Sequence, residues 1–305
     1  MGNVYDIVIV GAGPAGLSAG IYGVRAGKTV LCLEAASYGG QIINTPEVEN
    51  YPGIAKTSGY EFATALYNQA KDLGVEVKFE KVKGVEVDGD IRLVKTRKNT
   101  YECKAVIIAT GAKNKKLGLE SENAYIGAGI SYCATCDGAF YKDQEVAVVG
   151  GGNTAIEDAL YLSNTCSKVY LIHRRDAFRA EASLVESLKQ KPNVEFILNS
   201  TVSELVGNNG LDSVTVESRI TGEKTSLPIS CLFVAIGQEP QNSAFSNILD
   251  IDESGYVIAD ESCKTEVPGI FTAGDCRTKE VRQLTTAASD GAIAAMAACS
   301  YINYM

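Results

Sequence analysis

The sequence predicts an α/β fold in which two units built on parallel β-sheets share one chain of 305 residues. A strand, a glycine-rich turn and a helix follow one another at residues 5–27, and the same succession returns at residues 145–173. A third observation is the tail, residues 243–305, which resumes the pattern of the first unit. The length agrees with this reading, because 305 residues suffice for about two domains of ordinary size.

The first unit opens with a buried strand that leads directly into a glycine turn. YDIVIV is apolar and β-branched, GAGPAG (residues 11–16) follows it, and LSAGIYGVRAG then has helical spacing up to Gly27. The next strand, TVLCLE, ends on Glu34. A glycine turn lets the backbone approach a pyrophosphate at a helix N-terminus, and an acid about 20 residues further on binds a ribose hydroxyl. We therefore expect a dinucleotide with free ribose hydroxyls at this turn.

The same pattern recurs in the middle of the chain. EVAVVGGGNTAIEDALYLSNTCSKVYLIHRRDAFRA is again strand, glycine turn (GGGNTA, residues 150–155), helix and strand. The second strand now runs into HRRDAFRA (residues 173–180), so Arg174 and Arg175 stand where the first copy has its acid. Arginines at this place suit a 2′-phosphate, which a carboxylate would repel. The second site is therefore predicted to bind NADPH; the alternative for these arginines is a solvated surface loop.

Two dinucleotide sites in one chain indicate two cofactors that exchange electrons. NADPH comes and goes, so the first site is predicted to hold the cofactor that stays bound, the flavin dinucleotide FAD. VIIATGA (residues 106–112), LFVAIGQEP (residues 232–240) and GIFTAGDC (residues 269–276) support this, because each is a buried strand that closes on a glycine turn. Asp275 could reach a polyol chain. The following run, AASDGAIAAMAACSYI, is predicted to be a helix whose start lies under the flavin.

The order of these pieces predicts a discontinuous domain. Residues 1–114 and 243–305 are assigned to an FAD-binding domain, and residues 115–242 to an inserted NADPH-binding domain. The fold class is therefore α/β, with two Rossmann-like, three-layer ββα dinucleotide-binding domains.

Charge and hydropathy exclude several classes of partner. The net charge of −9 argues against nucleic acid, since binding to phosphates requires a basic face. The opening run MGNVYDIVIVGAG has no basic leader and no small-residue cleavage site, so it is interpreted as a strand and not as a signal peptide. No apolar run reaches the ~18 residues that a membrane span needs. We expect a cytoplasmic protein without a membrane partner.

The stretch SYCATCDGAF holds Cys133 and Cys136 two residues apart, and Asp137 follows directly. Nine cysteines occur in all, and the other seven are scattered singly, as buried thiols in a reducing compartment usually are. A zinc site would need four ligands, but there is no second CxxC and the chain has one histidine. No metal site is expected, and redox chemistry is the leading interpretation of the pair.

The sequence at this point resembles the low-molecular-weight, bacterial-type thioredoxin reductases over essentially its whole length. CATCD combined with HRRxxxR is the most specific part of the resemblance. Asp158 departs from the family, which often has a second glutamate there, and the change is conservative. The motifs that carry the resemblance are GAGPAG (11–16), GGQI (39–42), VENYPG (48–53), ATGA (109–112), CATCDG (133–138), GGGNTA (150–155), HRRDAFRA (173–180), AIG (235–237), AGDC (273–276) and RQ (282–283).

The resemblance implies an NADPH-dependent flavoprotein, a homodimer, that reduces thioredoxin or a thioredoxin-like disulfide protein. In the family scheme Cys136 lies nearest the flavin, Cys133 attacks the substrate disulfide, and Asp137 handles the protons. The alternative for Asp137 is a plain N-cap carboxylate. Two other functions stay open: a reductase of the same fold that acts on another disulfide protein or is fed by ferredoxin, and a flavin-binding sensor without turnover. Ferredoxin-fed relatives typically lose the HRRxxxR arginines, which this sequence keeps.

The candidate cofactor ligands come from the same motifs. Those expected to bind FAD are Gly11, Gly13, Gly16, Glu34, Gly40, Gln41, Asn50, Asp275, Arg282 and Gln283. Those expected to bind NADPH are Gly150, Gly152, Asn153, Thr154, Arg174, Arg175 and Arg179. Further cofactor-binding candidates within these motifs are Pro14, Ala15, Thr110, Gly111, His173, Ile236, Gly237 and Gly274.

Overall fold

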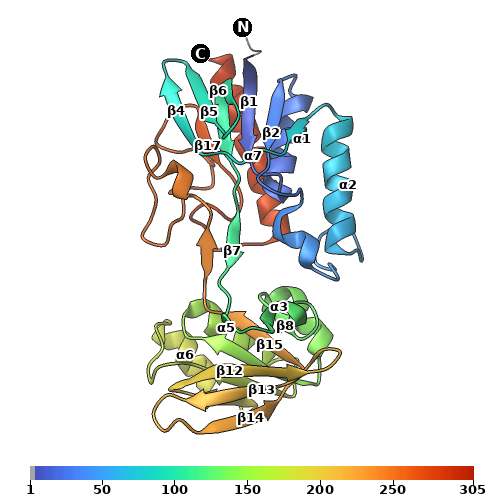
Figure 1. The fold of residues 1–305 in the computed structure, drawn as a ribbon, viewed down its shortest axis with the longest axis vertical. Coiled ribbons are helices and arrows are strands. Elements are labelled where there is room, and N and C mark those ends of the chain that lie inside the picture. The colour runs from blue at the N-terminus through green and yellow to red at the C-terminus, as the bar shows by residue number, and fades with distance from the viewer. Residues whose placement is uncertain (1–3) are drawn as a thin grey trace. The chain divides into compact units, whose positions relative to one another are not determined.

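The computed structural model describes residues 4–305, so the first three residues of the predicted opening run lie outside the described residues. The chain divides into two compact units, shown in Figure 1. One unit is discontinuous and combines the chain up to Lys113 with Glu239–Met305, and the other is the continuous segment Asn114–Gln238. Each is an α/β unit on a largely parallel sheet, so the predicted fold class is confirmed. Which cofactor belongs to which unit stays a prediction.

The discontinuous unit is built on a seven-stranded sheet in the order β3-β2-β1-β6-β5-β4, with β17 also paired to β6. Its strands are β1 (Tyr5–Val10), β2 (Val30–Leu33), β3 (Glu76–Lys78), β4 (Gly84–Asp88), β5 (Ile91–Lys95), β6 (Thr100–Ile108) and β17 (Ile270–Thr272). The helices and 3₁₀ turns of the unit are α1 (Pro14–Arg25), η1 (Gly40–Asn44), α2 (Gly59–Asp72), η3 (Ser243–Phe245) and α7 (Leu284–Asn303).

Strand β6 ties the two segments of this unit together. Its first half pairs antiparallel with β5, and its last three residues pair parallel with β17 on the side away from β1. The tail of the chain therefore completes the sheet that the N-terminal segment begins. This arrangement follows from the apolar runs at residues 106–112 and 269–276, which are strands as the sequence predicts.

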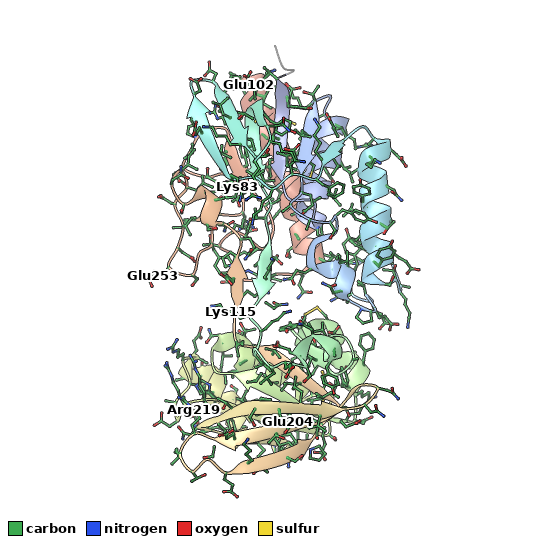
Figure 2. All side chains as sticks on the ribbon, viewed as in Figure 1. Lys83, Glu102, Lys115, Glu204, Arg219 and Glu253 are labelled. Carbon is green, nitrogen blue, oxygen red and sulfur yellow. A yellow bond between two sulfur atoms is a disulfide. The ribbon has the colours of Figure 1, made fainter. Side chains whose placement is uncertain are left out.

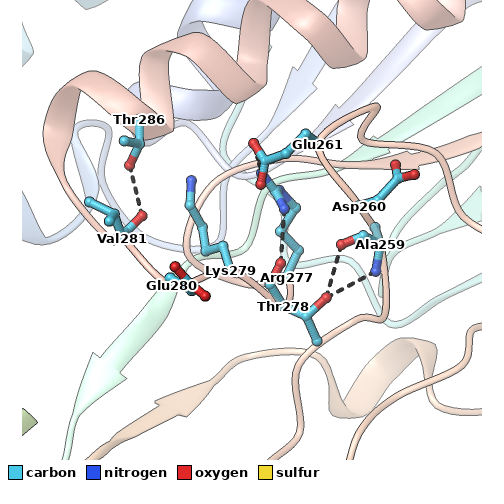
Figure 3. A pocket seen from close by; sticks show the side chains of 9 residues that line it. All are labelled: Ala259, Asp260, Glu261, Arg277, Thr278, Lys279, Glu280, Val281 and Thr286. Atoms are coloured by element: carbon cyan, nitrogen blue, oxygen red, sulfur yellow. Dashed lines mark hydrogen bonds and ion pairs between the residues drawn. The ribbon is translucent and has the colours of Figure 1, made fainter. Parts of the chain in front are cut away.

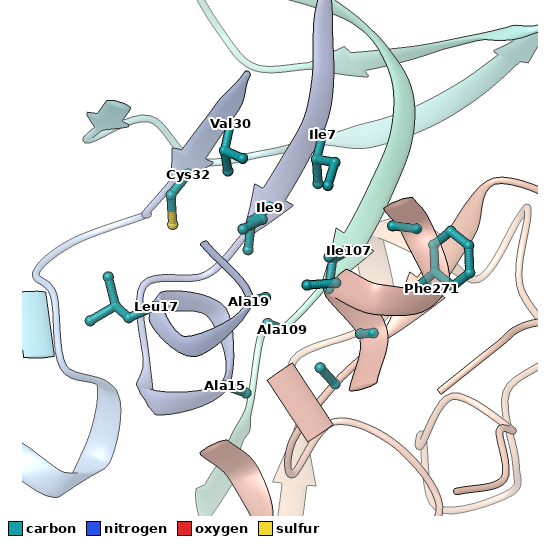
Figure 4. Close-up of a cluster of buried hydrophobic side chains, with 14 of the residues drawn as sticks. Ile7, Ile9, Ala15, Leu17, Ala19, Val30, Cys32, Ile107, Ala109 and Phe271 are labelled. Atoms are coloured by element: carbon teal, nitrogen blue, oxygen red, sulfur yellow. The ribbon is translucent and has the colours of Figure 1, made fainter. Parts of the chain in front are cut away.

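Alternate residues of β1 enter two different cores, as the period of two in a strand requires. Ile7 and Ile9 belong to the core that contains residues of α1 and α7 (Figure 4). Val8 and Val10 face the opposite core, which includes Phe245 of η3. The β-branched run YDIVIV is therefore buried on both faces, which is why it lacks polar alternation.

Helices α1 and α7 pack at the distance that a glycine allows. A Cβ added at Gly291 of α7 would lie 2.1 Å from the carbonyl oxygen of Ala15 in α1. Beside this contact the Ser18 hydroxyl donates a hydrogen bond of 2.7 Å to the Ala288 carbonyl. The N-terminal helix and the last helix of the chain are therefore held backbone to backbone.

A buried ionic cluster fixes the loop before α7 to that helix. Asp290 of α7 accepts hydrogen bonds from Arg277 at 2.8 and 2.9 Å, from Lys279 at 2.9 Å and from the Gly274 backbone at 2.9 Å. Arg277 also bonds to Glu261, whose side chain is 84% exposed. Arg277, Lys279 and Glu261 line a cavity of about 460 Å³ (Figure 3). Burial alone raises the pKa of Asp290, but the hydrogen bonds from the two cations outweigh it and lower the pKa.

The continuous unit has three layers. Its central sheet has the parallel order β11-β10-β9-β15-β8, a second sheet has the antiparallel order β12-β13-β14, and helices cover the remaining face. The strands of the unit are β8 (Ile130–Ser131), β9 (Glu145–Gly150), β10 (Lys168–Ile172), β11 (Val194–Ile197), β12 (Ser200–Gly207), β13 (Leu211–Ser218), β14 (Lys224–Pro228) and β15 (Cys231–Ala235). Its helices and 3₁₀ turn are α3 (Glu122–Tyr125), α4 (Ala134–Asp137), η2 (Gly138–Tyr141), α5 (Asn153–Leu162) and α6 (Ala182–Lys189).

Strand β9 shows how the layers are held. Val146 and Val148 enter the core shared with α5 and α6, whereas Ala147 and Val149 enter the core shared with the antiparallel sheet. The chain passes between the two units through β7 (Ala112–Asn114) and β16 (Gln238–Pro240), which pair with each other. Among residues 4–305, every helix is too short or too polar to cross a lipid bilayer.

We expect Asp290→Asn to lower the free energy of unfolding by about 3–5 kcal/mol at pH 7. The change keeps the size of the side chain but leaves two buried cations without their shared anion. Glu261→Gln is the matched control, because it removes the exposed partner of Arg277 and should cost less than ~1 kcal/mol. Urea unfolding of the three proteins measures both values.

The pH dependence of unfolding in wild type and Asp290→Asn gives a second test. The pKa of Asp290 in the folded state lies below its unfolded value of about 3.9. The contribution of Asp290 to the free energy of unfolding is therefore complete above about pH 3.9 and is lost as the pH falls through the folded-state pKa. The difference between wild type and Asp290→Asn should therefore shrink below about pH 4. Equal unfolding of the two proteins at pH 7 would contradict the assignment.

Candidate redox site and nucleotide sites

In the discontinuous unit the predicted FAD ligands gather at one edge of the sheet. Strands β1, β2, β6 and β17 run parallel, so their carboxyl ends meet at the same edge. The loops that follow these ends are the glycine turn at 11–13, Glu34, Thr110–Gly111 and Gly274–Asp275. Ligands of open α/β sheets bind at this edge. The topology therefore brings together motifs that lie far apart in the sequence.

The first glycine turn leaves backbone donors free of side-chain caps. Gly11 has φ +112°, and a Cβ there would lie 2.2 Å from the Ala109 carbonyl oxygen, so only glycine fits. Gly13 is the N-cap of α1 and makes no side-chain capping bond, which leaves the helix N-terminus available to an anion. Glu34 accepts a hydrogen bond of 2.8 Å from the Ala12 backbone. The predicted ribose-binding acid thus lies against the predicted pyrophosphate turn.

Three polar side-chain atoms of this unit are buried without a hydrogen-bond partner among the described residues: Nε of Arg92, Oδ1 of Asp275 and Nε of Arg282. Asp275 and Arg282 are both predicted FAD ligands. Burial raises the pKa of Asp275, and the nearby cations Lys279 and Arg282 oppose this shift. The Arg282 guanidinium also lies 4.2 Å from the ring centroid of Tyr256. An orphan acceptor and an orphan donor indicate a polar ligand at this place.

Other predicted FAD ligands bond to one another or to the backbone. Gln41 donates to the Ala112 carbonyl at 2.5 Å. Asn50 donates to Gln283 at 3.4 Å, which joins two motifs from opposite ends of the chain. Gly40 begins η1, and a Cβ added there would lie 3.4 Å from the Cα of Gly13. Gly40 therefore lies against the first glycine turn.

Thr110 has a partner that the sequence analysis did not predict. Its hydroxyl bonds to Asn242 Oδ1 at 2.8 Å, and the Asn242 amide donates to the carbonyls of Gly255 and Cys276. Asn242 is only 1% exposed. No glycine motif contains it, and its contacts form only when the tail folds back on the first segment.

The continuous unit repeats the arrangement with cations in place of the acid. Strand β9 ends at Gly150, and Gly152 is the N-cap of α5 without a side-chain capping bond. A Cβ at Gly151 would lie 2.0 Å from the ring of His173, which is itself 7% exposed. His173 is thus part of the packing below the turn, and burial lowers its pKa. The candidates that are exposed at this edge are Gly152, Asn153, Thr154, Arg174, Arg175, Arg179, Ile236 and Gly237.

Asn153 is engaged in the protein itself. Its amide donates to Glu181 at 3.1 Å and its oxygen accepts from the Glu181 backbone at 2.9 Å. Arg179 contributes its backbone N–H to the Gly151 carbonyl at 2.8 Å, which places the HRRDAFRA loop beside the glycine turn. The sequence analysis did not predict the Asn153–Glu181 contact, because Glu181 lies outside the motif.

Cys133 and Cys136 form a disulfide with a Cα–Cα distance of 5.3 Å (Figure 2). Cys133 is the N-cap of α4, so the pair stands at a helix N-terminus. Strand β8 precedes it and pairs parallel with β15, which in turn pairs with β9. The disulfide and the second glycine turn therefore lie along the same edge of one sheet.

Asp137 ends α4 with its carboxylate directed at the segment before the disulfide. Its Oδ2 accepts a hydrogen bond of 2.6 Å from the hydroxyl of Ser131. Burial raises the pKa of Asp137, and the Ser131 bond partly opposes this shift. The carboxylate makes no capping bond to η2, for which Asp137 is the N-cap residue. The plain N-cap alternative is thus not what the structure shows.

Ser131 is the residue of this site that the sequence analysis missed. It stands two residues before Cys133 in the stretch SYCATCDGAF, and it is 4% exposed. A serine at the end of a two-residue strand gives no pattern of its own. Only the fold of α4 back over β8 shows that Ser131 meets Asp137.

Comparisons with known proteins agree with this geometry. Residues 5–291 match the family model of the pyridine nucleotide-disulphide oxidoreductases. A thioredoxin reductase of Peptoclostridium acidaminophilum is 42% identical over 99% of this chain and 98% of its own length. A thioredoxin reductase of Bacillus subtilis is 41% identical over 98% of this chain and 95% of its own.

Solved structures give the same result. The crystal structure of thioredoxin reductase from Streptococcus pyogenes superposes with a TM-score of 0.95 at 40% identity, covering 99% of both chains. Family model, relatives and structure all match nearly the entire chain, well beyond the glycine motifs. The chain belongs to the pyridine nucleotide-disulphide oxidoreductase family, and within it to the thioredoxin reductases.

Proposed function

We propose that this protein is an NADPH-dependent flavoprotein that reduces the disulfide of thioredoxin or a thioredoxin-like protein through Cys133 and Cys136. The observation that carries the proposal is the redox disulfide itself. It stands at a helix N-terminus, with a half-buried carboxyl beside it, on the same sheet edge as a nucleotide-type glycine turn. The printed names of the relatives support thioredoxin as the substrate.

The residues of the discontinuous unit fit FAD. The uncapped N-terminus of α1 suits a pyrophosphate, and Glu34 beside it suits a ribose. The orphan Oδ1 of Asp275 and Nε of Arg282 supply an acceptor and a donor for polar groups of the flavin. We assign FAD to this unit on these grounds.

NADPH is assigned to the continuous unit. Gly152 at the uncapped N-terminus of α5 suits its pyrophosphate. Arg174, Arg175 and Arg179 are exposed around the same turn and suit the 2′-phosphate. Ferredoxin as the electron source is less favoured, because it would leave these arginines without a role.

The two cofactors, when bound, supply a hydride and a two-electron relay, and the cysteines supply the exchange with protein disulfides. In that exchange the Cys133 thiolate attacks one sulfur of the substrate disulfide and the other leaves as a thiolate. Cys136 then attacks Cys133, which releases the second substrate sulfur and re-forms the Cys133–Cys136 disulfide. Two protons reach the substrate sulfurs, and we assign their transfer to the Asp137 carboxyl. By family resemblance, Cys136 is the cysteine that faces the flavin.

We further propose a homodimer in the cytoplasm. The resemblance to the family supports the dimer. The cysteine pattern supports a reducing compartment, because the seven other cysteines are all buried and unpaired.

Anaerobic titration with NADPH, followed by an assay with thioredoxin, tests the proposed function. We expect a yellow protein with about one flavin per chain, bleached by NADPH, and sustained NADPH oxidation once thioredoxin is added. A flavin that NADPH does not bleach would favour a ferredoxin-fed enzyme. Bleaching without turnover on any disulfide acceptor would favour a sensor.

We expect Cys133→Ser and Cys136→Ser each to abolish thioredoxin reduction while NADPH still bleaches the flavin. Reduction of the substrate needs both sulfurs, whereas hydride transfer needs neither. Stopped-flow absorbance separates the two steps. Cys166→Ala, which removes a buried thiol of the same unit, should leave both steps within about twofold of wild type. Near wild-type turnover by either serine variant would refute the role of the pair.

Arg174→Ala or Arg175→Ala should weaken NADPH binding by about 10- to 100-fold and barely change NADH binding. A hydrogen bond to a charged group contributes roughly 1.5–3 kcal/mol, and ~1.4 kcal/mol is tenfold in affinity. Steady-state KM values for the two nucleotides measure the effect. Lys224→Ala is the control, since Lys224 is an exposed cation on β14 of the same unit. Equal losses for NADPH and NADH would show that the arginines do not contact the 2′-phosphate.

A further inference from the structure

Ser131 is a buried polar side chain that the proposed chemistry of the site does not use. It ends β8, where parallel pairing with Phe233 of β15 fixes its backbone. Its side chain is 4% exposed, so its hydroxyl must find partners inside the protein. The hydroxyl contacts Cys133, the proposed nucleophile toward the substrate disulfide, and Asp137, the proposed carrier of protons.

The hydroxyl of Ser131 has three neighbours and one proton. Its oxygen accepts from the Cys133 backbone N–H at 3.1 Å. It can donate to Oδ2 of Asp137 at 2.6 Å or to the Cys133 carbonyl at 3.3 Å. A hydroxyl donates one bond and accepts two, so both choices satisfy it. The short bond to a carboxylate is the stronger of the two.

The two directions in which the Ser131 hydroxyl can donate correspond to the ionised and the protonated state of Asp137. When Asp137 is ionised, the hydroxyl donates to it and accepts from the Cys133 N–H. When Asp137 is protonated, its O–H can donate to Ser131 Oγ, and the hydroxyl proton turns to the Cys133 carbonyl. The bond from the Cys133 N–H persists in both states. Ser131 is therefore satisfied before and after Asp137 gains a proton.

We propose that Ser131 is a positioning residue for the exchange reaction, which holds the Asp137 carboxyl and the Cys133 backbone together in both protonation states of Asp137. The inference rests on the proposed function, because it assumes that Asp137 carries protons for the cysteine pair. It assigns no bond-making step to Ser131. The serine acts through its neighbours only.

The surroundings of Asp137 leave Ser131 as its main polar support. The titratable groups that face it are Tyr141 of η2 and Cys231 of β15, and burial raises the pKa of both, so both are neutral at pH 7. The ring of Tyr161 on α5 lies beside the neighbouring Gly138. Among the described residues, no cation forms an ion pair with Asp137. Loss of the Ser131 hydroxyl should therefore destabilise the ionised carboxylate with little compensation.

The test compares the pH dependence of thioredoxin reduction in three variants. Ser131→Ala removes the hydroxyl, and Ser131→Thr retains it. Ser163→Ala is the matched control, since Ser163 is a buried serine of the same unit whose hydroxyl bonds only to the Leu160 carbonyl. The ionisation due to Asp137 is recognised by its absence from Asp137→Asn.

In Ser131→Ala we expect the ionisation of Asp137 to move up by about one pH unit, which is a tenfold change in its protonation equilibrium. Ser131→Thr should restore the profile to within about a third of a unit, and Ser163→Ala should match wild type. In the Asp137→Asn background, Ser131→Ala should cost less than about twofold further in kcat, because its effect passes through Asp137.

An unchanged pH profile in Ser131→Ala would overturn the proposal, and so would an equal loss of kcat with and without Asp137. If Ser131→Ala proves unstable in thermal unfolding, Ser131→Thr decides, and failure of the threonine to restore the profile counts against the proposal. A wild-type protein that leaves thioredoxin oxidised contradicts the proposed substrate instead. The Ser131 series is then measured with a small aromatic disulfide as acceptor, which keeps the two failures distinct.

Discussion

Parallel pairing at β1 and at β9 is the constraint on which both units depend. A parallel strand cannot be joined to its neighbour by a tight turn, so each crossover carries a helix and each strand ends at the same edge. The loops at that edge include the uncapped N-termini of α1 and α5, where backbone N–H groups are available to an anion. In one unit they hold Glu34 and Asp275, and in the other they hold the arginines and the disulfide. The parallel direction of the strands therefore determines where the candidate site residues lie.

The discontinuity of the first unit adds a second constraint. Strand β17 pairs with the last residues of β6, although an entire unit separates them in the chain. Asp290 and Arg277 then fasten the loop after β17 to α7. Since Asp275 and Arg282 lie in that same loop, the candidate flavin ligands are ordered only when the tail has been added to the sheet. Contacts of such long sequence separation are expected to form late in folding.

Much of this could be predicted from the sequence, and the reason is local. A strand, a turn and a helix are predicted within about 30 residues at each of two places, where YDIVIV and EVAVVG lead into glycine turns. The three-layer ββα class implies a second sheet, but the strands β12, β13 and β14 were not located in the sequence, because they are half polar and are joined by short turns without a fixed signature. The close approach of α1 and α7 also needed the structure, since nothing near Gly291 shows which helix it meets.

Polar contacts between distant residues were the least predictable part of the sites. The sequence did not show that Asn153, a predicted nucleotide ligand, bonds to Glu181 or that Thr110 bonds to Asn242. Asp137 was named from the CATCD motif, but its partner Ser131 was not. A motif fixes which side chains are present at a turn. It does not determine which of these side chains form hydrogen bonds within the protein and which remain available to a ligand.

Burial of the seven other cysteines has a consequence for the whole reaction. A thiol must ionise to attack a disulfide, and burial raises the pKa of six of these thiols, that of Cys103 to about 12. This includes Cys166 and Cys231, which belong to the same unit as the redox pair and are buried. A thiol that stays protonated at pH 7 is a poor nucleophile, so these six do not compete with Cys133 for a substrate disulfide. Burial of the single cysteines thus confines thiol–disulfide exchange in the described chain to the pair at the surface of α4.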